Sequence, residues 1–283
     1  MKIWWMDTYP GYMRLQFGNQ DDFKKYTWNY FVGESLKETW EPYPMKDEGN
    51  GRASDCPGGC RGALYVSERV VQIVKELQVE PVEFLPITHA GTTYYIMNVL
   101  KVKDCIDGAD SRMNDHTVPD FTDITFKRES VADEHLFKAF YPGVQKVYNN
   151  RIFVSDALKT RIEQMNLVGF QFVEEWDSEF SWQEKEKKYE AMIEEVDRSL
   201  LQTFDYKRAI SLVENERMTV YSGKHAMKLD EKGRLASGIL LLDGTYNWML
   251  PLYIPPIYLG LKWGIREERK SFLKRLQERI AFR

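Results

Sequence analysis

The chain has 283 residues, of which 43% are hydrophobic and 14% aromatic, a composition that supports a substantial core and excludes a disordered chain. Residues 1–180 contain 20 basic and 28 acidic side chains, whereas residues 181–283 contain 19 and 15, so the net charge of −4 is unevenly placed. The acidic first part argues against nucleic acid as its ligand and suits a basic protein partner, although acidity for solubility alone explains it equally well.

The sequence shows no recognisable targeting or membrane-spanning segment. The first 12 residues lack the apolar core and cleavage site of a signal peptide. The most apolar stretch, residues 239–263, is interrupted by Asp243, Asn247 and three prolines, so we expect no membrane span. The three cysteines are odd in number and have no disulfide spacing, which is typical of reduced thiols. We therefore expect a cytoplasmic protein.

Residues 1–62 are rich in aromatic side chains and show no clear periodicity, and their second half, residues 41–62, has the Pro, Gly, Asn and Asp content of a loop. Two later stretches share one pattern at an offset of 88 residues. Residues 63–84 and 151–172 each contain a short apolar strand, a serine followed by an acid, an amphipathic helical spacing and a second apolar strand. The pattern predicts a duplicated strand–helix–strand unit, although two such units also match by chance.

Further strands are predicted between and after these units. Residues 82–87 and 93–102 read as consecutive strands, and residues 121–126 as a third, with Phe121 and Phe126 buried. Residues 181–216 have the spacing of one long amphipathic helix that can break near Phe204 and Asp205.

The last part of the chain is predicted to return to strands and to end in a helix. A hairpin turn is expected at Asp243 and Gly244, and a basic amphipathic helix over residues 265–282. The mixed order of strands and helices predicts an α+β fold with mixed and antiparallel sheets, divided into a domain of residues 1–180 and a C-terminal helix–hairpin–helix extension of residues 181–283. The basic helix suggests either anionic lipid or nucleic acid as a ligand, or a solvated face docked on the acidic domain.

The cysteines suggest two kinds of chemistry. Cys56 and Cys60 flank Pro-Gly-Gly, but no second pair of ligands completes a zinc site, so we expect a plain turn and no bound metal. Cys105 with His116 and the nearby acids suggests a thiol–base pair, and an enzyme acting on a small substrate or a macromolecule is the alternative function. Three acids near Cys105 lack the order of a calcium loop and are expected to cap a turn: Asp104, Asp107 and Asp110.

A cluster of acids around one tryptophan follows the second repeat. Charge steers the encounter with a basic partner, and an aromatic ring supplies area to bury, so this cluster is our candidate partner-binding site. The alternative is a solvated loop that leads into the helix predicted after residue 180. The candidate residues are Glu174, Glu175, Trp176, Asp177 and Glu179.

The order of these segments resembles a family of bacterial immunity proteins from polymorphic toxin systems, with immunity-protein families eleven and forty-three as the nearest matches. The resemblance covers about residues 63–177 and consists of two serine-led helix starts, a strand ending in Pro, an aromatic strand with a following Asp- and Ser-containing segment, and a final Gly-Phe-X-Phe. The residues that carry it are Ser67, Glu68, Pro86, Tyr94, Tyr95, Asn98, Val99, Asp104, Asp107, Ser111, Ser155, Gly169, Phe170 and Phe172.

The resemblance implies a non-enzymatic bacterial protein of the cytoplasm that binds and neutralises a cognate toxin in interbacterial competition. It implies no cofactor and no metal. Its marks are fold residues and carry over no toxin-binding site, so the acidic cluster is assigned from its charge alone. Residues 181–283 lie outside the resemblance.

Overall fold

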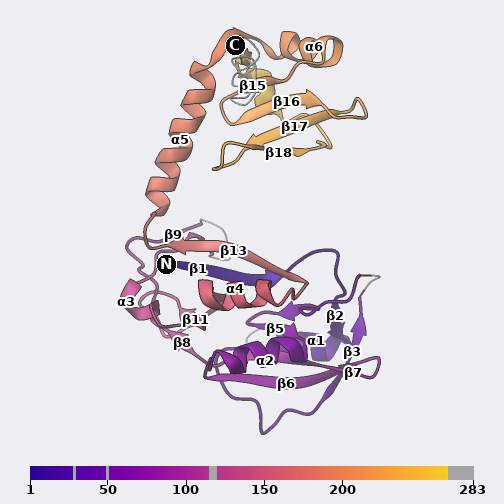
Figure 1. Cartoon of the computed structure of the whole chain (residues 1–283), viewed down its shortest axis with the longest axis vertical. Coiled ribbons are helices and arrows are strands. Elements are labelled where there is room, and N and C mark those ends of the chain that lie inside the picture. Colours follow the sequence, from indigo (N-terminus) through magenta and orange to yellow (C-terminus); the bar gives the residue numbers. More distant parts are fainter. Residues whose placement is uncertain (28–29, 49–50, 115–119, 267–283) are drawn as a thin grey trace, which may run out of the picture. The chain divides into compact units, whose positions relative to one another are not determined.

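The computed structural model describes the chain except for residues 28–29, 49–50, 115–119 and 267–283. The chain forms two compact units, Met1–Ser181 (unit 1) and Trp182–Arg283 (unit 2). Unit 1 contains helices and several sheets and unit 2 contains helices and one sheet, so the fold is α+β, as predicted (Figure 1). None of the helices in the described part of the chain is long and apolar enough to cross a membrane.

Unit 1 contains two larger sheets. The first is five-stranded with the order β13-β1-β12-β11-β8, and the second is six-stranded with the order β2-β3-β6-β7-β5-β4. The strands of the first sheet are β1 (Lys2–Thr8), β8 (Val102–Lys103), β11 (Leu136–Phe140), β12 (Val147–Ser155) and β13 (Phe170–Asp177). Those of the second are β2 (Leu15–Phe17), β3 (Tyr43–Asp47), β4 (Gly59–Cys60), β5 (Ala63–Val66), β6 (Val82–His89) and β7 (Thr92–Val99). A small third sheet pairs β9 (Arg112–Met113) with β10 (Phe121–Asp123).

The N-terminal region is more regular than its sequence indicates. Strand β1 lies between β12 and β13 and pairs antiparallel with both, with Ile3 and Met6 fully buried on opposite faces of the sheet. The expected loop of residues 41–62 contains β3 and β4, and helix α1 (Gln20–Thr27) precedes it. A strand that is apolar on both faces has no period of two, which is why the sequence pattern did not reveal β1.

The two predicted strand–helix–strand units have the same local geometry. Helix α2 (Glu68–Glu76) connects β5 to β6, which flank β7, and helix α4 (Asp156–Gln164) connects β12 to β13, which flank β1. Ser67 and Ser155 precede these helices with nearly identical extended backbone angles. Each serine N–H also donates to a carbonyl of a preceding segment, Asp55 at 2.9 Å and His135 at 3.2 Å. An origin by duplication stays a prediction.

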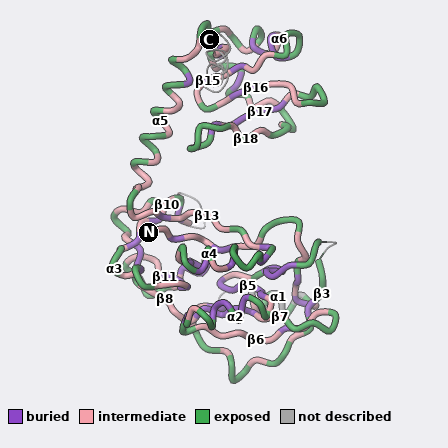
Figure 2. The backbone as a smooth tube through the Cα atoms, in the orientation of Figure 1, coloured by how far each residue is buried: buried purple, intermediate pink, exposed green. Residues whose placement is uncertain are grey.

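The main core of unit 1 lies where α2 and α4 pack against the sheets. Figure 2 shows the buried backbone concentrated along these elements. Val70, Val74, Leu158 and Ile162 are almost completely buried there. Each such side chain contributes about 1.5–3 kcal/mol through removal of apolar surface from water. A second cluster on the other face of the first sheet includes the buried Phe126, and short helix α3 (Arg128–Val131) packs against it. Phe121 and Phe126 are both buried, as predicted.

Unit 2 departs from the predicted single long helix. Helix α5 (Trp182–Arg198) ends before strand β14 (Leu200–Phe204), and α6 (Tyr206–Glu216) then begins at the N-cap Asp205, whose carboxylate accepts from the Arg208 N–H at 2.9 Å. Leu200 and Phe204 are therefore strand residues, because β14 pairs with the later strand β19 (Trp263–Arg266). Local periodicity cannot anticipate this long-range pairing.

A six-stranded sheet with the order β14-β19-β15-β16-β17-β18 forms the rest of unit 2. Its remaining elements are β15 (Val220–Ser222), β16 (His225–Leu229), β17 (Leu235–Leu240), β18 (Tyr246–Met249) and the 3₁₀ helix η1 (Pro256–Gly260). Ile265 and Arg266 belong to β19 and not to the predicted C-terminal helix, whose other residues lie outside the described part of the chain. Several large apolar side chains of unit 2 are exposed, and Leu252 is 100% exposed.

Candidate functional site

The acidic cluster lies on β13, an edge strand of the first sheet of unit 1. The register between β13 and β1 shifts between Ile3 and Trp4, so that Ile3 pairs with Trp176 and Trp4 with Glu174. Glu175 is the extra residue of this β-bulge. Consecutive strand residues point to opposite faces, so Glu174 and Glu175 have opposite surroundings, and the bulge places Glu175 on the same face as its other neighbour, Trp176.

Glu174 and Asp177 both bind Lys2. The Lys2 ammonium donates to Glu174 at 2.6 Å and lies 3.6 Å from Asp177. The hydrogen bond to Glu174 raises the pKa of Lys2, although partial burial of the lysine opposes the rise. Glu179 is 68% exposed, and its carboxylate lies 3.5 Å from the Arg128 guanidinium. These three acids at the surface therefore already have basic partners within unit 1.

Glu175 lies in the interior and pairs with Arg151, with side chains only 7% and 13% exposed. Arg151 also donates to the Phe121 carbonyl at 2.7 Å, lies 3.5 Å from the carboxylate of Asp120, and lies over the Trp5 ring at 5.3 Å. Burial raises the pKa of Glu175, and the charge of Arg151 opposes that rise. The ion pair joins β12 to β13, and the contacts of Arg151 with Phe121 and Asp120 join both strands to the start of β10.

Trp176 is also buried and packs its ring edge to face against Phe126, with centroids 5.9 Å apart. The interpretation of the cluster as acids around an accessible aromatic ring therefore needs correction. A partner that docks on the surface does not meet the side chains of Glu175 and Trp176, because the bulge directs both inward. A toxin-binding role stays a prediction for Glu174, Asp177 and Glu179.

The cysteine and aspartate candidates have structural surroundings. Cys105 is fully buried, and burial raises the pKa of its thiol to about 12. The Asp107 carboxylate accepts from the backbone N–H of Ala109 at 3.0 Å, and Asp104 lies 3.3 Å from Lys127. His116 lies outside the described residues.

Cys56 and Cys60 are free thiols, and Cys60 belongs to β4 instead of a plain turn. Burial raises the pKa of the Cys56 thiol, and that of Cys60 to about 12. Within the described part of the chain, no group of three or more His, Cys, Asp or Glu residues is arranged to hold a metal ion.

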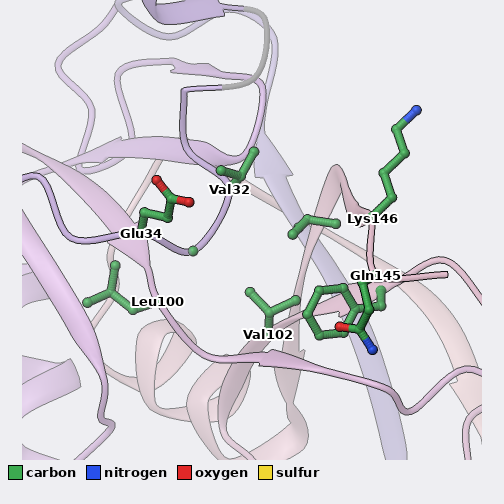
Figure 3. Close-up of a pocket in the computed structure, with 9 residues that line it drawn as sticks. Val32, Glu34, Leu100, Val102, Gln145 and Lys146 are labelled. Atoms are coloured by element: carbon green, nitrogen blue, oxygen red, sulfur yellow. The ribbon is translucent and has the colours of Figure 1, made fainter.

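Sequence patterns gave no sign of a pocket at the opposite edge of the same sheet (Figure 3). We call it the 31–34 pocket. Residues 32–34 line one wall of this cavity of about 650 Å³, and the backbone of that wall is held from residue 31 onward. Five half-buried apolar side chains form its floor, and three exposed polar side chains form its rim. The floor residues are Val32, Leu100, Val102, Phe140 and Val147, and the rim residues are Glu34, Gln145 and Lys146.

The wall of the 31–34 pocket is held by buried polar side chains from distant strands. The Lys138 ammonium donates to the Phe31 carbonyl at 2.9 Å, and the Asn98 amide donates to the Glu34 carbonyl at 2.9 Å. Glu83 accepts from the hydroxyl of Ser35 and from the backbone N–H of Leu36.

Gly33 has a φ of 93°, and a side chain there would begin 2.4 Å from the Val102 methyl group. Only glycine therefore fits this wall, both for its backbone conformation and for its close approach to β8. Of these residues, only Asn98 carried a sequence signal, as one of the marks of the family resemblance.

The profile of the Imm11 immunity protein family matches residues 13–176. The chain belongs to this family. A comparison with curated proteins finds no match. The Imm11 match covers most of unit 1, including β13 up to Trp176 and every residue that lines the 31–34 pocket, and leaves unit 2 outside.

The residues that suggested an immunity protein from the sequence have structural roles in this Imm11 member. Ser155 caps α4 by accepting from the Leu158 N–H, and Gly169 has a φ of 92°. Ser111 accepts from the Thr125 N–H at 2.9 Å. Asn98 differs from the others, because its structural role is to fix the wall of an accessible pocket.

Proposed function

We propose that this protein binds a cognate bacterial toxin through a protein–protein contact and thereby neutralises it. Membership of the Imm11 immunity family carries this proposal. We place the protein in the cytoplasm of a bacterium that uses a polymorphic toxin system in interbacterial competition. Neutralisation by binding requires no catalytic residue, cofactor or nucleic acid from the immunity protein.

The charge of unit 1 supports a basic toxin as the partner. Residues 1–180 carry eight more acidic than basic side chains. An excess of one charge accelerates the encounter with a partner of opposite charge, which an inhibitor of a lethal protein needs. We propose that Glu174, Asp177 and Glu179 contribute to this long-range attraction. Their internal partners Lys2 and Arg128 make them poor anchors in a contact.

The test is co-expression with the protein encoded by the adjacent upstream open reading frame, with cell survival and a stoichiometric co-purified complex as the two readouts. We expect both. A Cys105→Ala variant is the control for enzymatic detoxification and should protect equally well, because the thiol is buried and its pKa is raised. Survival without a complex, or loss of protection in the Cys105 variant, would contradict neutralisation by binding.

A further inference from the structure

We propose that the 31–34 pocket receives an apolar side chain of the toxin, and that a lysine or arginine beside that side chain pairs with Glu34. This inference rests on the proposed function and adds the place and chemistry of the contact. It assigns the anchor to the edge of the first sheet that carries β8, four strands away from the acidic cluster on β13.

The arrangement of the pocket matches the centre of a protein interface. Contacts that dominate binding are apolar anchors in a pocket, surrounded by polar residues that exclude water. Here the floor is apolar, and Glu34, Gln145 and Lys146 lie at the exposed rim. Figure 3 shows Glu34 and Lys146 on opposite sides of the floor. A small-molecule site differs, because it needs polar groups that converge on the ligand from within the pocket.

The wall of the pocket is fixed at a cost to stability. Lys138 is completely buried, yet among the described residues its ammonium has one hydrogen-bond acceptor, the Phe31 carbonyl. Asn98 is also completely buried, and its Oδ1 has no partner among the described residues. Buried polar groups that are incompletely satisfied are expensive, and such departures concentrate at functional sites. Both side chains hold the backbone of residues 31–34, so the unfavourable burial of these two polar groups fixes the position of the wall.

The charge at the rim indicates the partner beside the anchor. Glu34 is exposed, and its carboxylate has no ion pair or hydrogen bond within the described residues. The acids of the β13 cluster, in contrast, already pair with Lys2, Arg151 or Arg128. An unpaired carboxylate on an acidic unit is complementary to a cation, and a cation next to an apolar anchor fits Glu34 and the floor together. Lys146 on the far side favours an acidic or polar toxin residue at that position.

The experiment measures the affinity of the full-length protein for the protein encoded by the adjacent upstream open reading frame. Two variants test the pocket: Val32→Phe fills the floor, and Glu34→Lys reverses the rim charge. We expect Val32→Phe to weaken binding by about 30-fold or more, as for a central interface residue. Glu34→Lys should weaken binding by about 10-fold or more, with a weaker salt dependence.

Glu129→Lys is the matched control, because Glu129 is exposed on α3 and does not line the pocket, and the charge change is the same. It should change affinity by less than about threefold. Leu252→Glu tests the exposed apolar surface of unit 2 as the competing site. Circular dichroism of each variant checks the fold, and Glu34→Lys keeps the test open if Val32→Phe fails to fold.

The outcomes separate the two proposals. A wild-type complex that tolerates both pocket variants would overturn the pocket inference and leave the proposed function intact, as would a complex abolished only by Leu252→Glu. Failure of the wild-type protein to form a complex would refute both.

Discussion

The neighbouring glutamates of β13 should lose clearly different amounts of stability on the same substitution. Removing one partner of a buried ion pair costs about 3–5 kcal/mol when the other charge is left uncompensated. In Glu175→Ala, Arg151 keeps the Phe121 carbonyl and the carboxylate of Asp120 at 3.5 Å. We therefore expect a loss at or just below the lower end of this range, about 2–3 kcal/mol of unfolding free energy. In Glu174→Ala, a partly exposed pair with Lys2 is lost, at a cost below about 1 kcal/mol.

The assay is equilibrium urea unfolding followed by circular dichroism. The double variant Arg151→Met with Glu175→Leu, measured together with its two single variants, completes a mutant cycle, because it removes both charges and keeps apolar volume. We expect it to recover most of the loss of Glu175→Ala, since replacing a buried pair by apolar side chains is often neutral. Equal losses for the two glutamates, or a double variant that loses the sum of its single changes, would refute the assignment of Glu175 to the interior pair.

Three further predictions concern the interior and the acidic strand. Burial lowers the pKa of Lys138 to about 7, whereas the lysine of the unfolded chain keeps its proton to about pH 10.4. Between these two pH values the unfolded chain therefore binds one more proton than the folded protein, and the stability of the wild type should rise with pH relative to that of Lys138→Met. In urea unfolding, the slope of this difference should approach about 1.4 kcal/mol per pH unit. A parallel pH dependence of the two proteins would contradict this. Cys56 and Cys105 are buried and Cys60 is half-buried, and burial raises the pKa of all three thiols, so they should resist a thiol reagent at pH 8 and react only after unfolding. Rapid labelling of the native protein would show that at least one thiol is accessible. Replacing Glu174, Asp177 and Glu179 together by Ala should slow toxin association less than about threefold in stopped-flow measurements, because each acid already has a basic partner. A slowing above about tenfold would show that the toxin contacts β13 directly.

The sequence was most informative where a local period of apolar residues coincides with a local signal. Serine followed by an acid predicted the starts of α2 and α4, and alternating apolar residues predicted β6 and β7. These features rest on contacts within a few residues along the chain, which is why they can be read without the fold. The same segments carried the resemblance that the Imm11 profile confirms.

Tertiary structure alone decided which charged residues face a partner. The sequence treats Glu174 and Glu175 as equivalent acids, but in the folded sheet Glu174 lies beside Lys2, whereas the bulge opposite β1 places Glu175 on the buried side with Trp176, beside Arg151. Strand β14 likewise interrupts a helical period because its partner β19 lies about 60 residues later. In both cases the decisive partner is distant in sequence, so no local pattern contains it.

The 31–34 pocket is the clearest case of this kind. Its wall is fixed by Asn98, 64 residues from Glu34, and by Lys138, 107 residues from Phe31. The sequence alone suggests that Lys138 is a solvated charge, and only the folded chain buries it and places its ammonium beside the Phe31 carbonyl. The sequence by itself determined the fold class and the family. The surface available to a toxin was decided by hydrogen bonds between segments that meet only in the folded chain, because the free energy of a polar side chain depends on the partners that surround it.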